Sequence, residues 1–178
     1  MYKKCLVDSP PSMPLPTFTL LLHSYTHLTF NQKRPQLLTE LGHQLGSRLF
    51  HGCRFTSQHF LTKGEQRPVS AKQVLQDIKF NLFPTIFGKR ASKIEIFVSQ
   101  IKHQKTGQNV QGYVISDPSP LYLSDLSKSN YVVRFLCSVL EGYMAQAGLQ
   151  GKAHGSVISD KKAAKCEFII VFDDQPNK

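Results

Sequence analysis

The first half of the chain carries a helical pattern of apolar residues. One face of a helix is expected over residues 17–30, and a longer helix is expected from Pro35, where a missing N–H costs nothing. A third helix begins at Ser70, whose spacing to Gln73 is that of a capping box, and is expected to break at Pro84. The apolar faces of these helices are Phe18, Leu21, Leu22, Tyr25 and Leu28; then Leu38, Leu41, Leu45 and Leu49; then Val74, Leu75, Ile78 and Leu82.

The second half has a mixed pattern, with strands on either side of one strong helix. The expected elements are a loop over 99–109, a strand over 113–115, a turn over 117–120, a helix over 131–147 that stops at Gly148, and strands over 153–159 and 166–172 joined by a hairpin loop over 160–165. Apolar residues occupy both faces of the last strand, which predicts cover on both sides. Together the two halves predict an α+β fold of about four main helices and a small antiparallel sheet.

The domain organisation follows from length and composition. The chain has 178 residues, enough for one domain with a substantial core. Proline and serine are frequent over residues 1–16, which predicts a flexible N-terminal arm before a single domain over 17–178. No apolar run reaches the roughly 18 residues of a membrane-spanning helix. The basic start is followed by Asp8 and prolines rather than by the apolar region of a secretory signal, so an intracellular protein is expected.

Two glycines lie four residues apart in the predicted helix that begins at Pro35. Gly42 and Gly46 stand beside the leucine stripe, and each glycine in a helix costs about 1 kcal/mol relative to alanine. A partner that packs very close to the helix backbone would explain both. The alternative is that the helix tolerates this loss of stability without a closely packed partner.

The net charge of +10 is concentrated between Arg54 and Lys105. A basic segment of this kind attracts phosphate groups, either of nucleic acid or of an anionic membrane surface. A solvated basic face with no ligand is the alternative, because charge alone does not select a partner. Aromatic residues do not alternate with the basic ones in an RNA-binding pattern, so no nucleic-acid partner is expected. The candidate membrane-facing residues are Lys72, Lys79, Lys89, Arg90 and Lys93.

No set of residues with catalytic or cofactor-binding spacing is present. The chain has no glycine-rich phosphate loop and no nucleophile elbow. His23 and His27 share a helix face but lack the glutamate and third ligand of a zinc site. Cys53 and His51 would point to different faces of their helix, and Cys137 and Cys166 are expected to be small core residues. We therefore expect no enzyme activity, no cofactor and no metal.

Several segments, taken in order, resemble the Bet-three-like subunits of TRAPP, the transport protein particle. The leucine and glycine pattern from Leu38 to Leu49 is similar to the second helix of that family, and Val74 to Phe80 with Phe87 to Ala91 is similar to its third helix and aromatic turn. Tyr113 to Leu121 resembles the central strand, and Phe135 to Gly148 resembles the last helix. The turn at Phe87, Gly88 and Lys89 and the leucine-rich helix favour the subunit-five branch.

The resemblance implies a role in assembly. Subunits of this family dimerise through their first two helices and join a complex that tethers vesicles in ER-to-Golgi transport and catalyses guanine-nucleotide exchange on a Rab GTPase. Exchange belongs to the whole complex, so this chain is expected to be a non-catalytic subunit. Its expected partners are a Bet-three-type subunit, the Rab GTPase through the complex, and the membrane. The expected location is the cytoplasmic side of Golgi and endoplasmic reticulum membranes.

The resemblance also implies where the subunits meet. The helix contact is expected to lie partly within the fold and partly across a dimer. The residues expected in it are Phe18, Leu21, Leu22, Tyr25, Leu38, Leu41, Gly42, Leu45, Gly46 and Leu49.

The chain departs from the founding subunit of the family at one position. That subunit carries an acylated cysteine before its third helix, and Glu65 stands at the matching position here. Cys53 lies twelve residues earlier and is not its equivalent. No covalent acyl chain is therefore expected.

An alternative function uses the same scaffold as a small-molecule-sensing domain, as in prokaryotic ligand-binding regulators. Phe80, Phe83 and Phe87 would line the ligand pocket in that case, whereas a simple core is the competing interpretation of these aromatic residues.

Overall fold

A computed structural model describes residues 35–56, 70–87, 95–102, 109–118, 120, 129–160 and 163–173. The predicted arm over 1–16 and the predicted helix over 17–30 lie outside these residues. The elements are helices α2 (Pro35–Thr56), α3 (Ala71–Asp77), α4 (Phe83–Phe87) and α5 (Ser129–Gln146), the π-helical turn η2 (Ile78–Leu82), and strands β1 (Glu95–Lys102), β2 (Asn109–Asp117), β3 (Gly151–Asp160) and β4 (Ala163–Phe172). The α+β class predicted from the sequence is confirmed.

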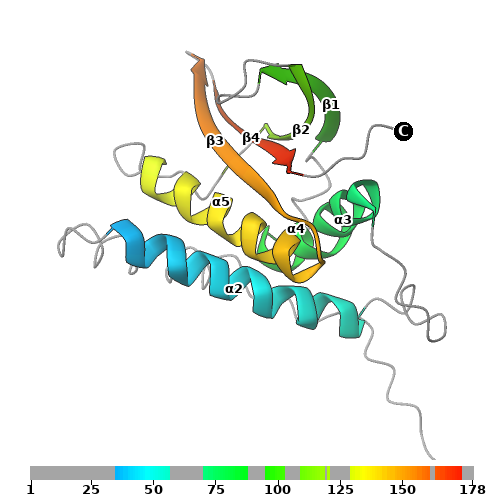
Figure 1. The fold of residues 1–178 in the computed structure, drawn as a ribbon. Helices are drawn as coiled ribbons and strands as arrows, with labels where there is room; N and C mark the ends of the chain where they lie inside the picture. Colours follow the sequence, from blue (N-terminus) through cyan, green and yellow to red (C-terminus); the bar gives the residue numbers. More distant parts are fainter. Residues whose placement is uncertain are drawn as a thin grey trace, which may run out of the picture.

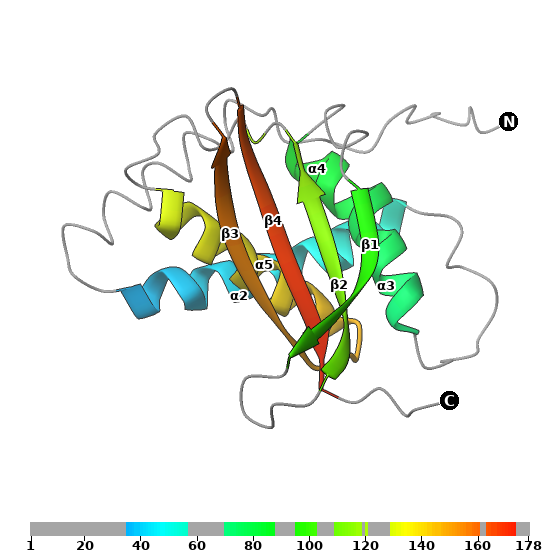
Figure 2. The same ribbon diagram turned by 90° about the horizontal axis from the view of Figure 1, so that it is seen from above.

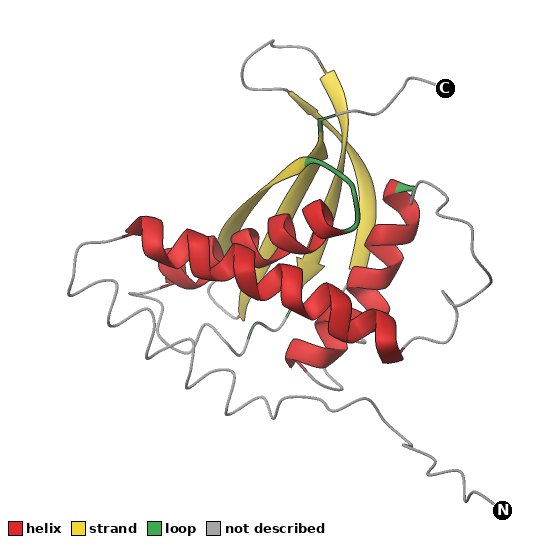
Figure 3. Cartoon of the chain, turned by 60° about the horizontal axis from the view of Figure 1, so that its bottom comes forward, coloured by secondary structure: helices red, strands yellow, loops and turns green. Residues whose placement is uncertain are grey.

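The elements form a sheet backed by helices on one side. Helix α5 lies beneath the sheet, and α2 lies on the side of α5 that faces away from the sheet (Figure 1). Helices α3 and α4 lie beside this pair, at one end (Figure 1). Viewed from above, the four strands lie in front of all the described helices (Figure 2), and from below the helices cover the sheet (Figure 3). The core is therefore the space between α5 and the inner face of the sheet, closed at one end by α3 and α4.

The sheet is antiparallel, with the strand order β1-β2-β4-β3. Ile115 of β2 lies opposite Phe168 of β4, which lies opposite Gly155 of β3. Ile115 and Phe168 are buried on the inner face. The order leaves β1 and β3 as the two edge strands of the described sheet.

Strand β4 has one buried face, as the alternation of its residues predicts. Cys166, Phe168 and Ile170 are buried against the helices, whereas Ile169 and Val171 on the outer face are half-buried. The expected cover on both faces is not found in the described part of the chain, because its helices all lie on one side of the sheet.

The first two strands were under-predicted. Residues 99–102 and 109 belong to β1 and β2, although a loop was expected over 99–109, and the pairing runs from Glu95–Ser116 to Lys102–Asn109. Backbone hydrogen bonds between strands do not depend on side-chain polarity, so the polar ends of these strands, at 99–102 and 109, give a weak sequence signal. The strands of the last hairpin likewise pair as far as Asp160 and Ala163, inside the predicted loop.

The third helix begins as predicted but does not break at Pro84. The Ser70 hydroxyl accepts a hydrogen bond from the Gln73 N–H, and the Gln73 side chain accepts one from the Ser70 N–H. The chain then passes through η2, where the Phe83 N–H bonds to the Ile78 carbonyl, and continues as α4. The wider π turn places Pro84 in the first turn of α4, where no intrahelical N–H is needed.

Helix α5 ends where Gly148 was predicted to stop it. Gly148 has φ 85°, in the left-handed region that favours glycine. The Leu149 N–H bonds back to the Met144 carbonyl, and the Gly148 N–H bonds to the Ala145 carbonyl. This C-cap turns the chain directly into β3.

Candidate subunit interface

Helix α2 presents two neighbouring stripes, one of glycines and one of leucines. Leu38 is fully buried, and Gly42 and Gly46 are buried. Leu41, Leu45 and Leu49 are half-buried and pack against the edge of the core. The structure therefore brings the predicted stripe together on one helix, with its leucine side only partly covered by described residues.

The glycine stripe lies directly against the backbone of α5. A Cβ atom at Gly46 would come within 2.0 Å of the Val139 carbonyl oxygen and 2.8 Å of the Tyr143 nitrogen. A Cβ atom at Gly42 would come within 2.8 Å of the Phe135 carbonyl oxygen. Real side chains do not tolerate these approaches to backbone atoms. The close partner that the two glycines predicted is helix α5 of the same chain.

Helix α5 contributes a glycine of its own to this crossing. A Cβ atom at Gly142 would lie 2.1 Å from the His43 carbonyl oxygen, and the Ser47 hydroxyl donates to the Gly142 carbonyl over 3.3 Å. Sequence reasoning missed this residue as a contact. A glycine in the middle of the apolar helix α5 could have indicated this close packing.

The other predicted interface residues cannot be placed. Phe18, Leu21, Leu22 and Tyr25 lie outside the described residues. Whether the leucine side of α2 meets another subunit stays a prediction.

A buried carboxylate joins α3 to α5. Asp77 is 6% exposed, and its two oxygens accept hydrogen bonds from the Tyr143 hydroxyl and the Asn81 side-chain amide. Burial, followed by the hydrogen bond and charge of Asp77, raises the pKa of Tyr143, so its hydroxyl stays protonated and donates. Sequence reasoning missed Asp77 because a single acid in a helix normally faces solvent.

Cys53 of α2 lies beside the same network. The Thr85 hydroxyl donates its one hydrogen to the Asn81 carbonyl over 2.7 Å, so the Cys53 thiol is the donor in its 3.7 Å contact with the Thr85 oxygen. Burial raises the pKa of Cys53, which keeps the thiol neutral. Cys53 is buried and His51 is exposed, so the two do not form a nucleophile and base.

The two predicted core cysteines are buried as expected. Cys137 and Cys166 are 8% and 0% exposed, and burial raises the pKa of Cys137 to about 12. The raised pKa keeps the Cys137 thiol neutral.

Two residues of the predicted basic patch lie among the described residues. Lys72 is exposed on α3, and the Lys79 ammonium lies 5.8 Å from the centre of the Phe80 ring. Lys89, Arg90 and Lys93 lie outside the described residues. Phe80 is 66% exposed, so an apolar ring and the Lys79 cation share this surface.

The three aromatic residues of the small-molecule alternative do not come together. The rings of Phe83 and Phe87 stack in the core with centroids 5.5 Å apart, whereas Phe80 points to solvent. These residues therefore do not jointly line a pocket.

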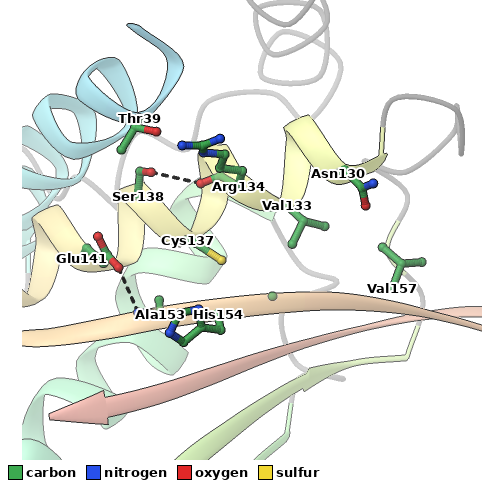
Figure 4. A pocket seen from close by; sticks show the side chains of 11 residues that line it. Thr39, Asn130, Val133, Arg134, Cys137, Ser138, Glu141, Ala153, His154 and Val157 are labelled. Atoms are coloured by element: carbon green, nitrogen blue, oxygen red, sulfur yellow. Dashed lines mark hydrogen bonds between the residues drawn. The ribbon is translucent and has the colours of Figure 1, made fainter. Parts of the chain in front are cut away.

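A groove of about 510 Å³ lies between α5 and β3. Its lining includes Asn130, Arg134 and Ser138 of α5 and His154 and Val157 of β3. In Figure 4, Val133 and Cys137 point from α5 toward β3, whereas Arg134 and Ser138 lie on the side of α5 toward Thr39 of α2. Glu141 closes one end by accepting a hydrogen bond from the Ala153 N–H over 3.0 Å. A second groove, of about 400 Å³, lies between α2 and Arg134.

Two other classes of site are absent from the described residues. No three histidine, cysteine, aspartate or glutamate residues among them lie close enough to hold a metal ion. No helix in the described part of the chain is long and apolar enough to span a bilayer.

Comparison with known protein families shows the family to which the chain belongs. Residues 18–173 match the model of the transport protein particle (TRAPP) component. The chain belongs to the TRAPP component family. This match includes α2, the sheet and α5, and it confirms the family to which the ordered motifs pointed; it does not distinguish the subunit-five branch.

A solved TRAPP structure has the same fold. A trafficking protein particle complex subunit 3 from Naegleria fowleri, covalently bound to palmitic acid, superposes with a TM-score of 0.53. The sequences are 17% identical over 89% of this chain and 97% of that one. Comparison with curated protein sequences gave no match.

The glycine contact can be tested by substitution. Gly46→Ala should lower the free energy of unfolding by about 3 kcal/mol, because the new methyl group meets the α5 backbone. Gly52→Ala is the matched control: nothing lies within 4 Å of its Cβ position, so the higher helix propensity of alanine should stabilise the protein slightly. Urea unfolding measures both, and equal effects would contradict the contact.

The Asp77–Tyr143 pair can be tested by a double-mutant cycle. Tyr143→Phe should cost about 2 kcal/mol, because it removes the donor from a buried carboxylate oxygen. In the Asp77→Ala background the same change should cost at least about 1 kcal/mol less. Additive losses in urea unfolding would show that the pair does not interact.

Proposed function

We propose that this chain is a non-catalytic subunit of a TRAPP vesicle-tethering complex, acting in ER-to-Golgi transport. The complex as a whole, rather than this chain, would catalyse nucleotide exchange on a Rab GTPase. Family membership supports a role as a complex subunit, and the turn at Phe87 to Lys89 favours the subunit-five branch.

The observation that carries the proposal is that the two stripes of α2 have different surroundings. Its glycine stripe packs against α5, whereas the leucine stripe is partly exposed. Leu37, which is 39% exposed, continues the leucine stripe. A row of partly exposed leucines on a helix that is held in place by α5 is suited to a helix–helix contact with another subunit. We propose that a Bet-three-type subunit covers this surface, together with Phe18, Leu21, Leu22 and Tyr25.

The palmitate of the Naegleria fowleri subunit is not carried over to this chain. Glu65, at the position that matches the acylated cysteine of the founding subunit, has no thiol to acylate. The proposed partner contact and membrane contact are therefore non-covalent.

The subunit contact is tested by co-purification with a Bet-three-type subunit. The double variant Leu41→Gln/Leu45→Gln should bind at least about tenfold more weakly, because two apolar side chains lose their cover. Glu40→Ala, at an exposed position of the same helix, should bind as the wild type does. Thermal unfolding checks that each variant is folded. Undiminished binding by a folded double variant would refute this surface, and a wild-type monomer that ignores the partner would refute the function.

We also propose that the basic patch meets an anionic membrane, with Phe80 inserting among the headgroups. Lys79 lies beside this exposed ring, Lys72 is exposed on the preceding helix α3, and each lysine near an anionic surface contributes about 1 kcal/mol. Placed at the headgroup level, the ring would add an apolar contact that pure charge attraction lacks.

Vesicle sedimentation tests the membrane contact. Lys72→Glu/Lys79→Glu should reduce binding to vesicles of phosphatidylcholine and phosphatidylserine at least about tenfold. Arg48→Glu/Arg134→Glu makes the same change in net charge at two other exposed positions and should have a much smaller effect. Equal losses in the two double variants would mean that only total charge matters.

A further inference from the structure

Strand β3 has one edge that no other strand of the described sheet covers. It is the last strand in the order β1-β2-β4-β3, and its opposite edge pairs with β4 from Gly151 to Asp160. In an antiparallel pair, successive residues point their N–H and C=O groups alternately toward and away from the partner strand.

Two hydrogen bonds fix which residues point away from β4. The Asp173 N–H bonds to the Gln150 carbonyl, so residue 150 faces β4. The Ala153 N–H instead reaches the Glu141 carboxylate of α5 over 3.0 Å, so residue 153 faces outward. By alternation, Gly155 and Val157 also direct their N–H and C=O groups to the free edge.

This free edge forms one wall of the groove of about 510 Å³ that Figure 4 shows. Helix α5 forms the other wall, and it comes close because Gly155 has no side chain: a Cβ atom there would lie 2.2 Å from Val133 Cγ1. The stretch from Ala153 to Val157 is about 13 Å long at the rise of a β-strand. The groove thus has the length of a short extended segment, with backbone hydrogen-bonding groups along one side.

The groove is lined by one cation, Arg134, and one carboxylate, Glu141, and Glu40 lies with Arg134 along the second groove. Arg134 is exposed on α5, and no carboxylate in the described part of the chain forms an ion pair with it. The nearest acid on α5, Glu141, is already engaged by the Ala153 N–H and by the Lys152 ammonium at 3.7 Å. An acidic side chain of a ligand could form an ion pair with Arg134.

We propose that an extended segment of a partner protein, carrying an acidic residue, adds to the sheet as a new strand beside β3. Its backbone bonds to the outward groups of Gly155 and Val157, and its carboxylate pairs with Arg134. Strand addition of this kind obtains affinity from main-chain hydrogen bonds and specificity from a few side chains. The groove is lined by none of the leucines of α2, so this proposal does not depend on the proposed subunit contact.

The test uses the full chain and a short fluorescent peptide that alternates threonine and valine around one aspartate. Val157→Pro removes the outward N–H while leaving the bonds to β4, since proline is tolerated where the N–H of an edge strand faces solvent. It should weaken binding, measured by fluorescence anisotropy, at least about tenfold. Val157→Ala retains the N–H and should stay within about twofold of the wild type.

Two further arms separate backbone pairing from charge. Arg134→Glu should weaken binding several-fold, whereas Arg48→Glu should not. Methylating the backbone nitrogens of the peptide should abolish binding to the unaltered chain, which keeps the test decisive even if Val157→Pro fails to fold. Absence of saturable binding at millimolar peptide, or binding that ignores methylation, would overturn the proposal. Sedimentation showing that a second copy of the chain occupies this edge would overturn it as well.

Discussion

The close approach of α2 and α5 is the constraint on which the rest of the structure depends. Gly42 and Gly46 on one helix and Gly142 on the other remove the side chains that would hold the two backbones apart. Because α5 also backs the sheet, this contact fixes α2 relative to the whole core. It also sets the rotation of α2 about its axis. With its glycine side against α5, the helix must turn its leucine side toward the edge of the core and the surface.

Polar contacts strengthen the same arrangement where helices α2, α3, α4 and α5 meet. Asp77 of α3 accepts a hydrogen bond from Tyr143 of α5, and Cys53 of α2 contacts Thr85 of α4. The ring of Phe50 meets the Tyr143 ring edge-on at 5.1 Å, so apolar and polar contacts converge on one residue of α5. A buried carboxylate with satisfied partners favours one packing of the helices over others, since any shift would leave it without its hydrogen-bond donors. The helices thus present a defined surface, as an assembly subunit requires.

Local signals were sufficient to predict much of this fold. The leucine stripe of α2, the capping box at Ser70 and the stop at Gly148 depend on residues close in sequence, and each is found where it was expected. Features that depend on tertiary contacts were not predictable in the same way. The spacing of the glycines predicted a closely packed partner but could not identify it as α5. No local sequence feature distinguishes the buried Asp77 from an acid that faces solvent. The π turn before Pro84 and the edge strand β1 were missed because pairing and packing, rather than composition, determine them.

The most direct test of the central claim is a cryo-electron microscopy structure of the native complex that contains this chain. The account predicts that Gly42 and Gly46 remain against α5 of the same chain while Leu41, Leu45 and Leu49 lie against a helix of another subunit. A complex in which these leucines face solvent, or in which α2 leaves α5 to pack its glycines on a different subunit, would contradict it.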